Sequence, residues 1–210
     1  GRADYTPVFF SDIPRLFKEN ILPVDAALIQ VAPPDKHGWC SYGVSVDYTK
    51  PAAECAKIVI AEVNKRMPRT LGSHIHIKDI DCPVETDRPL LEIPRPEITE
   101  LERKIGENIA ALVPDRANLQ LGIGSIPDAV LGFLKHKKDL GVHTEMFSDG
   151  VVELFEAGVI TNKYNNLNPG KLTACFLMGT QKLYDFADNN PVVEMKSVDY
   201  TNNIMVAGRL

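Results

Sequence analysis

The chain has 210 residues, of which 44% are hydrophobic and 24% are charged, and its formal net charge is −5. This balance is typical of a soluble globular protein and excludes an overall basic surface for nucleic acid. No apolar run reaches the roughly 18 residues of a membrane-spanning helix, and we find no secretory signal, so no membrane partner is expected.

The four cysteines favour a reduced compartment. Cys40, Cys55, Cys82 and Cys175 show no paired C-x-x-C spacing. We therefore expect a cytoplasmic protein in which all four are buried free thiols.

The first part of the chain alternates strand and helix patterns. Apolar runs predict strands over 26–32, ended by two prolines, and over 57–63; residues 43–46 predict a short extended stretch. Between them, Thr49 is a candidate N-cap for a helix with Pro51 just inside its start. Continuous rather than alternating apolar runs indicate a parallel sheet covered on both faces.

A proline-rich segment separates the two parts. Four prolines between residues 82 and 96 predict a linker. From Thr99 onward, apolar residues spaced three and four apart predict an amphipathic helix that Pro114 ends.

The second part repeats the alternation. A strand over 118–121 leads into a glycine turn, and Ser125 is a candidate N-cap for the helix that follows. The next strand begins at 141–143, and Ser148 or Asp149 is expected to cap a helix that runs through Ala157 and stops at Gly158. Further elements are predicted as strands over 171–178 and 192–195, a helix over 183–186, and an interrupted strand over 204–207.

The glycine turn is a candidate anion site. The spacing Gly122-x-Gly124-x-x-Pro127 is similar to a dinucleotide fingerprint, but Pro127 replaces its third glycine, and no Gly-Lys-Ser/Thr follows as a P-loop requires. Two glycines before a helix allow close backbone approach and offer free N–H groups to negative charge. A plain structural turn remains an equal alternative.

Glu145 is the candidate catalytic residue. It follows the strand that begins at 141–143, and ligands of open α/β sheets bind at the carboxyl ends of parallel strands. A carboxylate there can act as a base or as a nucleophile. The alternative is a solvated loop glutamate.

Other polar groups are weaker candidates. His74 and His76 share one face of an extended segment but have no third ligand in register, so we expect no metal site. His37, in the dense loop 33–40, either lines a site or lies in a surface turn. Lys65, Arg66 and Arg69 form either a solvated face or a phosphate contact. No G-x-S-x-G nucleophile elbow is present.

Several segments together resemble one family. The chain is similar over nearly its whole length to the acetyl-CoA hydrolase/transferase family, and most to its 4-hydroxybutyrate (butyryl-type) CoA-transferase branch. The segments that carry the resemblance are 1–5, 33–38, 43–47, 122–130, 143–150, 176–179 and 189–191.

The resemblance implies an α/β fold of two tandem CoA-transferase-type (NagB/RpiA-like) domains with mostly parallel sheets. Residues 1–88 would belong to the N-terminal domain, 89–97 to a linker, and 98–210 to the C-terminal domain with the catalytic glutamate. Members of the family are longer at both ends, and this chain has no initiator Met. We therefore expect a fragment with both domains incomplete.

The resemblance also implies a CoA-transferase that works in a ping-pong manner. Glu145 would be the nucleophile and would form a glutamyl-CoA thioester, in a polar site rich in hydrogen-bond donors. The expected partners are a short-chain acyl-CoA and a carboxylate acceptor, with no cofactor besides CoA as substrate and covalent intermediate, and a homodimer is expected. The residues expected to bind CoA are Gly122, Ile123, Gly124, Ser125 and Ile126.

Two other functions stay open on the sequence. An acyl-CoA hydrolase would use the same glutamate and resolve the intermediate with water. A non-catalytic ligand-binding module would use a related fold without turnover.

Overall fold

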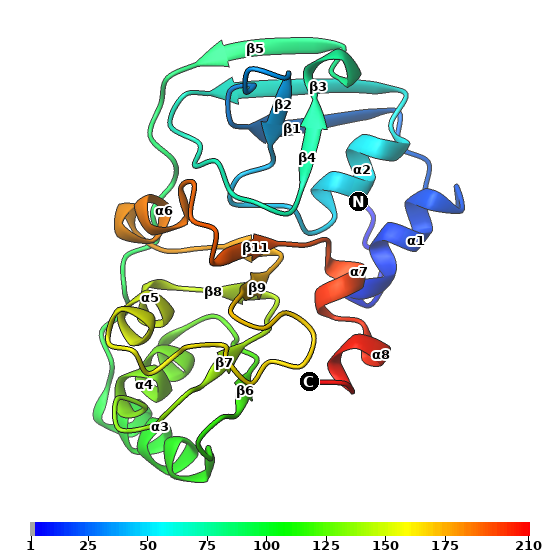
Figure 1. The fold of residues 1–210 in the computed structure, drawn as a ribbon. Helices are drawn as coiled ribbons and strands as arrows, with labels where there is room; N and C mark the ends of the chain where they lie inside the picture. The colour runs from blue at the N-terminus through cyan, green and yellow to red at the C-terminus, as the bar shows by residue number, and fades with distance from the viewer. Residues whose placement is uncertain (1–2) are drawn as a thin grey trace.

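The computed structural model describes residues 3–210 as an α/β fold with mostly parallel strand pairs. Figure 1 shows two groups of strands and helices, one above the other. The first group contains the strands of residues 26–86, and the second group contains the strands of residues 118–195. The chain from β11 (Val193–Met195) to α7 (Val198–Thr201) runs between them.

The first group is built on a parallel three-stranded sheet. Its strands β1 (Ala26–Val31), β3 (Ile58–Asn64) and β5 (Cys82–Thr86) stand in the order β1-β3-β5. The helix α2 (Thr49–Cys55) packs on β1, and β2 (Trp39–Ser41) pairs antiparallel with β4 (His74–His76).

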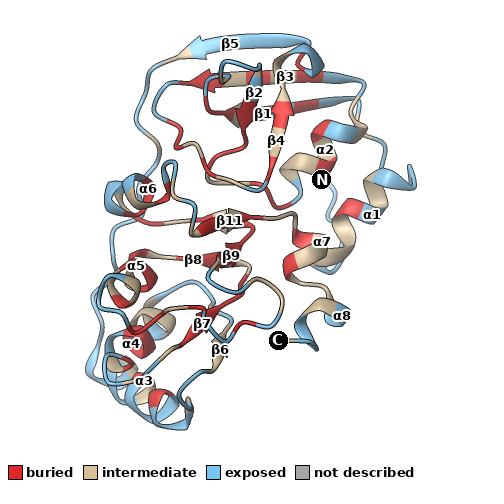
Figure 2. Ribbon diagram, viewed as in Figure 1, coloured by how far each residue is buried: buried red, intermediate tan, exposed pale blue. Residues whose placement is uncertain are grey.

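This sheet corrects two expectations. Burial alternates along β1, and Leu28 is 80% exposed, so one face is open among the described residues rather than both being covered. The proline-rich segment expected to be a linker begins with β5, an exposed edge strand (Figure 2). Because an edge strand tolerates proline, Pro83 does not prevent pairing with β3. Residues 87–99 form neither helix nor strand.

The helices of the second group pack against one another. The helix α3 (Glu100–Leu112) begins with the capping box of Thr99 and Glu102 and packs against α4 (Ser125–Phe133). The helix α5 (Asp149–Glu156) packs against α4 in turn. As predicted, α5 ends just before Gly158, whose φ of +73° favours glycine.

The strands of the second group are short and form three separate parallel pairs. Two parallel pairs join β6 (Asn118–Leu119) with β7 (Gly141–Val142), and β9 (Leu172–Ala174) with β11. A third joins β8 (Met146–Phe147) with β10 (Phe176–Leu177). The single strand predicted over 171–178 is therefore split at Cys175, because its two pieces pair with different partners.

Two predictions of extended chain are also wrong. Residues 43–46 form a turn in which Gly43 has a φ of +64°, and only Ser45 makes an isolated bridge, to Phe176. Residues 204–207 form the short helix α8 (Ile204–Ala207) rather than an interrupted strand.

The remaining helices are short and lie at the surface of the two groups. They are η1 (Phe10–Asp12), α1 (Ile13–Lys18), η2 (Ile77–Asp79) and α6 (Gln181–Ala187). Among residues 3–210, no helix combines the length and apolar composition needed to cross a bilayer.

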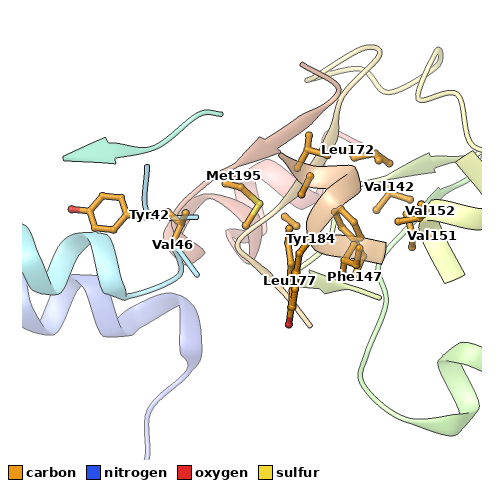
Figure 3. Packing of buried hydrophobic residues seen from close by; sticks show 14 of the residues in the cluster. Tyr42, Val46, Val142, Phe147, Val151, Val152, Leu172, Leu177, Tyr184 and Met195 are labelled. Carbon is orange, nitrogen blue, oxygen red and sulfur yellow. The ribbon is translucent and has the colours of Figure 1, made fainter. Parts of the chain in front are cut away.

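One hydrophobic core runs through both groups. Figure 3 shows Tyr42 and Val46 of the first group and, further along the same cluster, Met195, Leu177 and Phe147. The four cysteines are free: Cys40 and Cys175 are buried as expected, Cys55 is half-buried, and Cys82 is exposed because it lies on the edge strand.

Candidate functional site

Glu145 lies in a bend between β7 and β8, and its backbone is fixed by the neighbouring chain. Its carbonyl oxygen accepts hydrogen bonds from the amides of Cys175 (2.9 Å) and Phe176 (3.1 Å). The Cys175 thiol also donates to it, at 3.1 Å. Burial raises the pKa of that thiol to about 12, so the sulfur stays protonated and is no competing nucleophile.

The carboxylate of Glu145 is half-buried and has a polar partner. The side-chain amide of Asn202 donates to its Oε2 at 2.6 Å. Asn202 directly follows α7, 57 residues later in the chain. A neutral amide donor orients an ionised carboxylate without neutralising it, which suits a carboxylate nucleophile.

The two residues before Glu145 are buried. The Thr144 amide donates to the carbonyl of Thr173 at 3.0 Å, next to the isolated parallel bridge between His143 and Thr173. The Nε2–H of His143 donates to the Thr201 carbonyl at 3.1 Å, while its Nδ1 has no partner among the described residues. Burial lowers the pKa of His143, so the ring is held neutral.

The glycine turn lies beside this bend. The hydroxyl of Thr144 accepts from the Leu121 amide at 2.9 Å and lies 3.1 Å from the Leu121 carbonyl oxygen. Gly124 has a φ of +118°, a conformation that favours glycine. Within residues 3–210, no group accepts a hydrogen bond from the amides of Gly122, Ile123 or Gly124.

Ser125 is not the N-cap that the sequence predicted. Gly124 takes the N-cap position of α4, and Ser125 is the first helical residue. Its hydroxyl donates to Glu102 of α3, which lowers the pKa of that carboxyl together with the hydrogen bonds from Thr99. Ile126 stays exposed, as does Ile123.

The histidines of the first group lie in another place. His74 and His76 line a cavity of about 610 Å³ with Trp39 and Tyr42, on the antiparallel pair β2–β4. The carbonyl of His37 accepts a hydrogen bond from His76 Nε2 at 3.1 Å. This bond attaches the turn that contains His37 to strand β4. In the described part of the chain, no three His, Cys, Asp or Glu side chains are grouped to hold a metal ion.

The basic residues of the first group are partly paired. Arg69 forms a half-buried ion pair with Asp35 at 2.9 Å, and Arg66 forms an exposed one with Asp87 at 2.8 Å. Of the two alternatives expected for these residues, the solvated face does not hold for Arg69, which bonds to Asp35 and to the Trp39 carbonyl and so fixes the loop 33–40.

Three groups contribute to the site through contacts that the sequence did not predict. They are Asn202, the hydroxyl of Thr144, and the loop 44–47, whose Val46 and Asp47 amides donate to the Cys175 carbonyl at 2.9 and 3.1 Å. Each contact joins residues more than 20 positions apart, and no local pattern marks them.

Comparison with known proteins adds the family. Residues 1–93 match the model of the acetyl-CoA hydrolase/transferase N-terminal domain. The chain is 66% identical over 207 residues to a 4-hydroxybutyrate coenzyme A transferase from Clostridium kluyveri, covering 98% of this chain and 48% of that protein. The chain belongs to the acetyl-CoA hydrolase/transferase family.

Other members of the family agree in sequence and in fold. A succinyl-CoA:acetate/propanoyl-CoA:succinate CoA transferase from Fasciola hepatica is 52% identical over 98% of this chain and 44% of its own length. The crystal structure of a 4-hydroxybutyrate CoA-transferase from Porphyromonas gingivalis has a TM-score of 0.93 and 48% identity, covering 97% of this chain and 52% of that one. The chain thus spans about half the length of these family members, and the glycine turn and Glu145 lie beyond the part matched by the N-terminal model.

Proposed function

We propose that this protein is a CoA-transferase that moves CoA from a short-chain acyl-CoA to a carboxylate acceptor. The observation that carries the proposal is the Glu145 carboxylate, oriented by Asn202 in a bend that is hydrogen-bonded to the glycine turn. The family members are named for 4-hydroxybutyrate, succinyl-CoA, acetate and propanoyl-CoA, and short acyl groups of this kind are the substrates proposed here.

The proposed chemistry is covalent. A Glu145 oxygen attacks the thioester carbonyl, the C–S bond breaks, and CoA leaves as a thiolate from an acyl-glutamyl anhydride. The thiolate then attacks the Glu145 carbonyl carbon, which releases the acyl group as a carboxylate and leaves a glutamyl-CoA thioester. The acceptor carboxylate takes CoA by the reverse steps, and Glu145 is regenerated.

The glycine turn is proposed to bind CoA. Unpaired amides at Gly122, Ile123 and Gly124, next to the N-terminus of α4, favour an anionic or oxyanion group. Ser125 and Ile126 belong to the same proposed contact, although the Ser125 hydroxyl is occupied by Glu102 in this structure. The exposure of Ile123 leaves an apolar surface for the ligand.

The wider assembly is also part of the proposal. We propose two tandem NagB/RpiA-like domains with the site between them, a homodimer, a cytoplasmic location and no cofactor besides CoA. The contact of the loop 44–47 with Cys175, next to Glu145, supports a site at the junction of the two groups.

The test uses the enzyme expressed from its complete reading frame. Incubation with an acyl-CoA, reduction with borohydride and peptide mapping should find the modification at Glu145, and E145Q should lose it with the transferase activity. E156Q, an exposed carboxylate on α5, is the matched control. Modification elsewhere with activity intact in E145Q would contradict the proposal.

The same assay separates the two remaining functions. CoA release that needs an added carboxylate such as acetate supports transfer, whereas equal release without an acceptor indicates a hydrolase. A non-catalytic binding module would show neither, and E145Q would then leave every measured rate unchanged.

A further inference from the structure

The glycine turn and the Glu145 bend are joined by two hydrogen-bonded pairs. In the first, Thr144 bonds to the Leu121 backbone; in the second, the Ser148 hydroxyl donates to Asp128 Oδ1 at 2.8 Å. We call these two pairs the turn clamp. They connect the residues on either side of the turn, 121 and 128, to the residues on either side of Glu145, 144 and 148.

The hydrogen bonds between Thr144 and Leu121 form where strands β6 and β7 separate. The last backbone bond between the strands runs from the His143 amide to the Leu119 carbonyl, at 3.1 Å. Beyond it the chain leaves the sheet to form the turn, and Leu121 loses a strand partner. The Thr144 hydroxyl accepts from the Leu121 amide and lies within hydrogen-bond distance of both the Leu121 and Met146 carbonyls. Because a hydroxyl has one donor and two acceptor sites, it replaces a backbone partner at this point.

In the second pair, Ser148 does not cap its own helix through its side chain. Ser148 occupies the N-cap position of α5, but its side chain makes no hydrogen bond to that helix. It donates instead to Asp128 in the first turn of α4. Serine at an N-cap ordinarily bonds to its own helix, so the observed bond connects two helices at the expense of a local cap.

We propose that Thr144 and Ser148 are positioning residues that hold the free amides of the glycine turn at a fixed place relative to the Glu145 carboxylate. Neither side chain touches the reacting atoms, and both act through the turn. The inference rests on the proposed CoA-transferase function, because it assigns the turn to CoA and Glu145 to the attack. A nucleophile held by one loop and a ligand held by another react only if the two loops keep their relative position.

The test removes each hydroxyl in the enzyme expressed from its complete reading frame. T144V keeps the volume of the side chain and should lower kcat roughly 10- to 100-fold, the effect expected of an error of about 1 Å in position. T144S keeps the hydroxyl and should restore most of the rate. S148A should lower kcat about threefold to tenfold, as the loss of one hydrogen bond does.

A matched control exists in the same sheet. Thr173 is fully buried on β9, and its hydroxyl has no partner among the described residues, so T173V should leave kcat unchanged. Rates of glutamyl-adduct formation in a single turnover should fall with kcat in T144V and S148A. Hydrogen exchange at the Leu121 amide, which is bonded to the Thr144 hydroxyl, should speed up in T144V and not in T173V, a change that does not depend on turnover.

The outcomes separate the inference from the function. An active wild type with T144V or S148A within twofold of it in kcat overturns the inference alone. A wild type without CoA transfer overturns the proposed function and the positioning role with it. If T144V does not fold, S148A decides, because Ser148 is only half-buried and its truncation leaves no internal cavity.

Discussion

The side-chain amide of Asn202 connects Glu145 to a distant part of the chain. At 2.6 Å from Oε2 it fixes one oxygen of the carboxylate and leaves the other for the attack proposed above. The two residues come together because α7 lies beside the second group of strands (Figure 1).

We expect N202A to lower kcat/KM for CoA transfer by roughly 10²-fold, the usual effect of losing one preorganised donor in a site. Steady-state kinetics at saturating acceptor measures it. N166A, which removes an exposed side-chain amide bonded to the Arg209 carbonyl, is the control and should keep the wild-type value. A value for N202A within threefold of wild type would show that Glu145 needs no orientation.

His143 gives the stability of the protein a pH dependence. Its folded pKa is lowered by burial, and protonation would place an Nδ1–H where no acceptor lies among the described residues. The unfolded imidazole, with a pKa of about 6.5, binds the proton freely. The contribution of His143 to the free energy of unfolding should therefore have its full value above pH 6.5. Below pH 6.5 the free energy of unfolding should decrease by up to about 1.4 kcal/mol per pH unit, the value for one proton.

Urea unfolding at pH 7.5 and 5.5 measures this dependence. H143Q should lose less stability between the two pH values than the wild type does. His74, whose pKa burial also lowers, is present in both proteins and sets the remaining slope. Equal losses in the two proteins would contradict the assignment to His143.

At the scale of single residues, the sequence predicted where a residue lies in the fold better than which residues it hydrogen-bonds to. The bend at Glu145 lies where predicted, because the strand pattern before it is local. The capping of α4 was wrong, because the Ser125 hydroxyl bonds to Glu102, 23 residues earlier in the chain. Hydrogen-bond partners of this kind are decided by the packing of α3 on α4, which no local pattern contains.

Among the elements, the contact of α3 with α4 depends on Gly106. A Cβ added to Gly106 would lie 2.9 Å from the Ala129 side chain and backbone. Alanine favours helices over glycine, but here its methyl group would enter a filled space.

We expect G106A to lower the free energy of unfolding by about 1–3 kcal/mol, the cost of overpacking a close helix contact. The matched change is G132A on α4, where an added Cβ meets nothing within 4 Å, and it should raise stability by up to about 1 kcal/mol. Denaturant unfolding of both variants tests the difference. A stabilised G106A would mean that the two helices separate easily.

Element predictions succeeded where the signal was local. The start of α3 agrees with the sequence because Thr99 and Glu102 form a capping box within four residues. The strand over 171–178 was predicted whole but is split, because β9 pairs with β11 and β10 pairs with β8. Pairing partners are a tertiary property, and they decide where an apolar run changes direction.

At the scale of the whole molecule, the two groups of strands are joined by backbone hydrogen bonds as well as by the core. The Val46 amide donates to the Cys175 carbonyl, and the Leu177 amide donates to the Val44 carbonyl at 2.8 Å. A second connection runs from the Met195 amide to the Leu71 carbonyl at 2.8 Å.

Unfolding should therefore be a single cooperative transition. Trp39, the one tryptophan of the sequence, lies on β2 and reports the first group by fluorescence, while far-UV circular dichroism reports the helices of both. The two denaturation curves should coincide. Separate midpoints would show that the groups unfold independently and that the bonds between them are weak.

The sequence by itself determined the α/β class, most of the helix and strand positions, the family resemblance, and Glu145 and the glycine turn as the segments of interest. These depend on periodicity, caps and motifs that a few neighbouring residues contain. Only the tertiary structure decided that Asn202 meets Glu145, that Ser125 bonds to Glu102, and that the turn clamp joins the two segments. Each of these contacts forms when elements distant in the chain pack together, and their geometry is a property of that packing rather than of any local pattern.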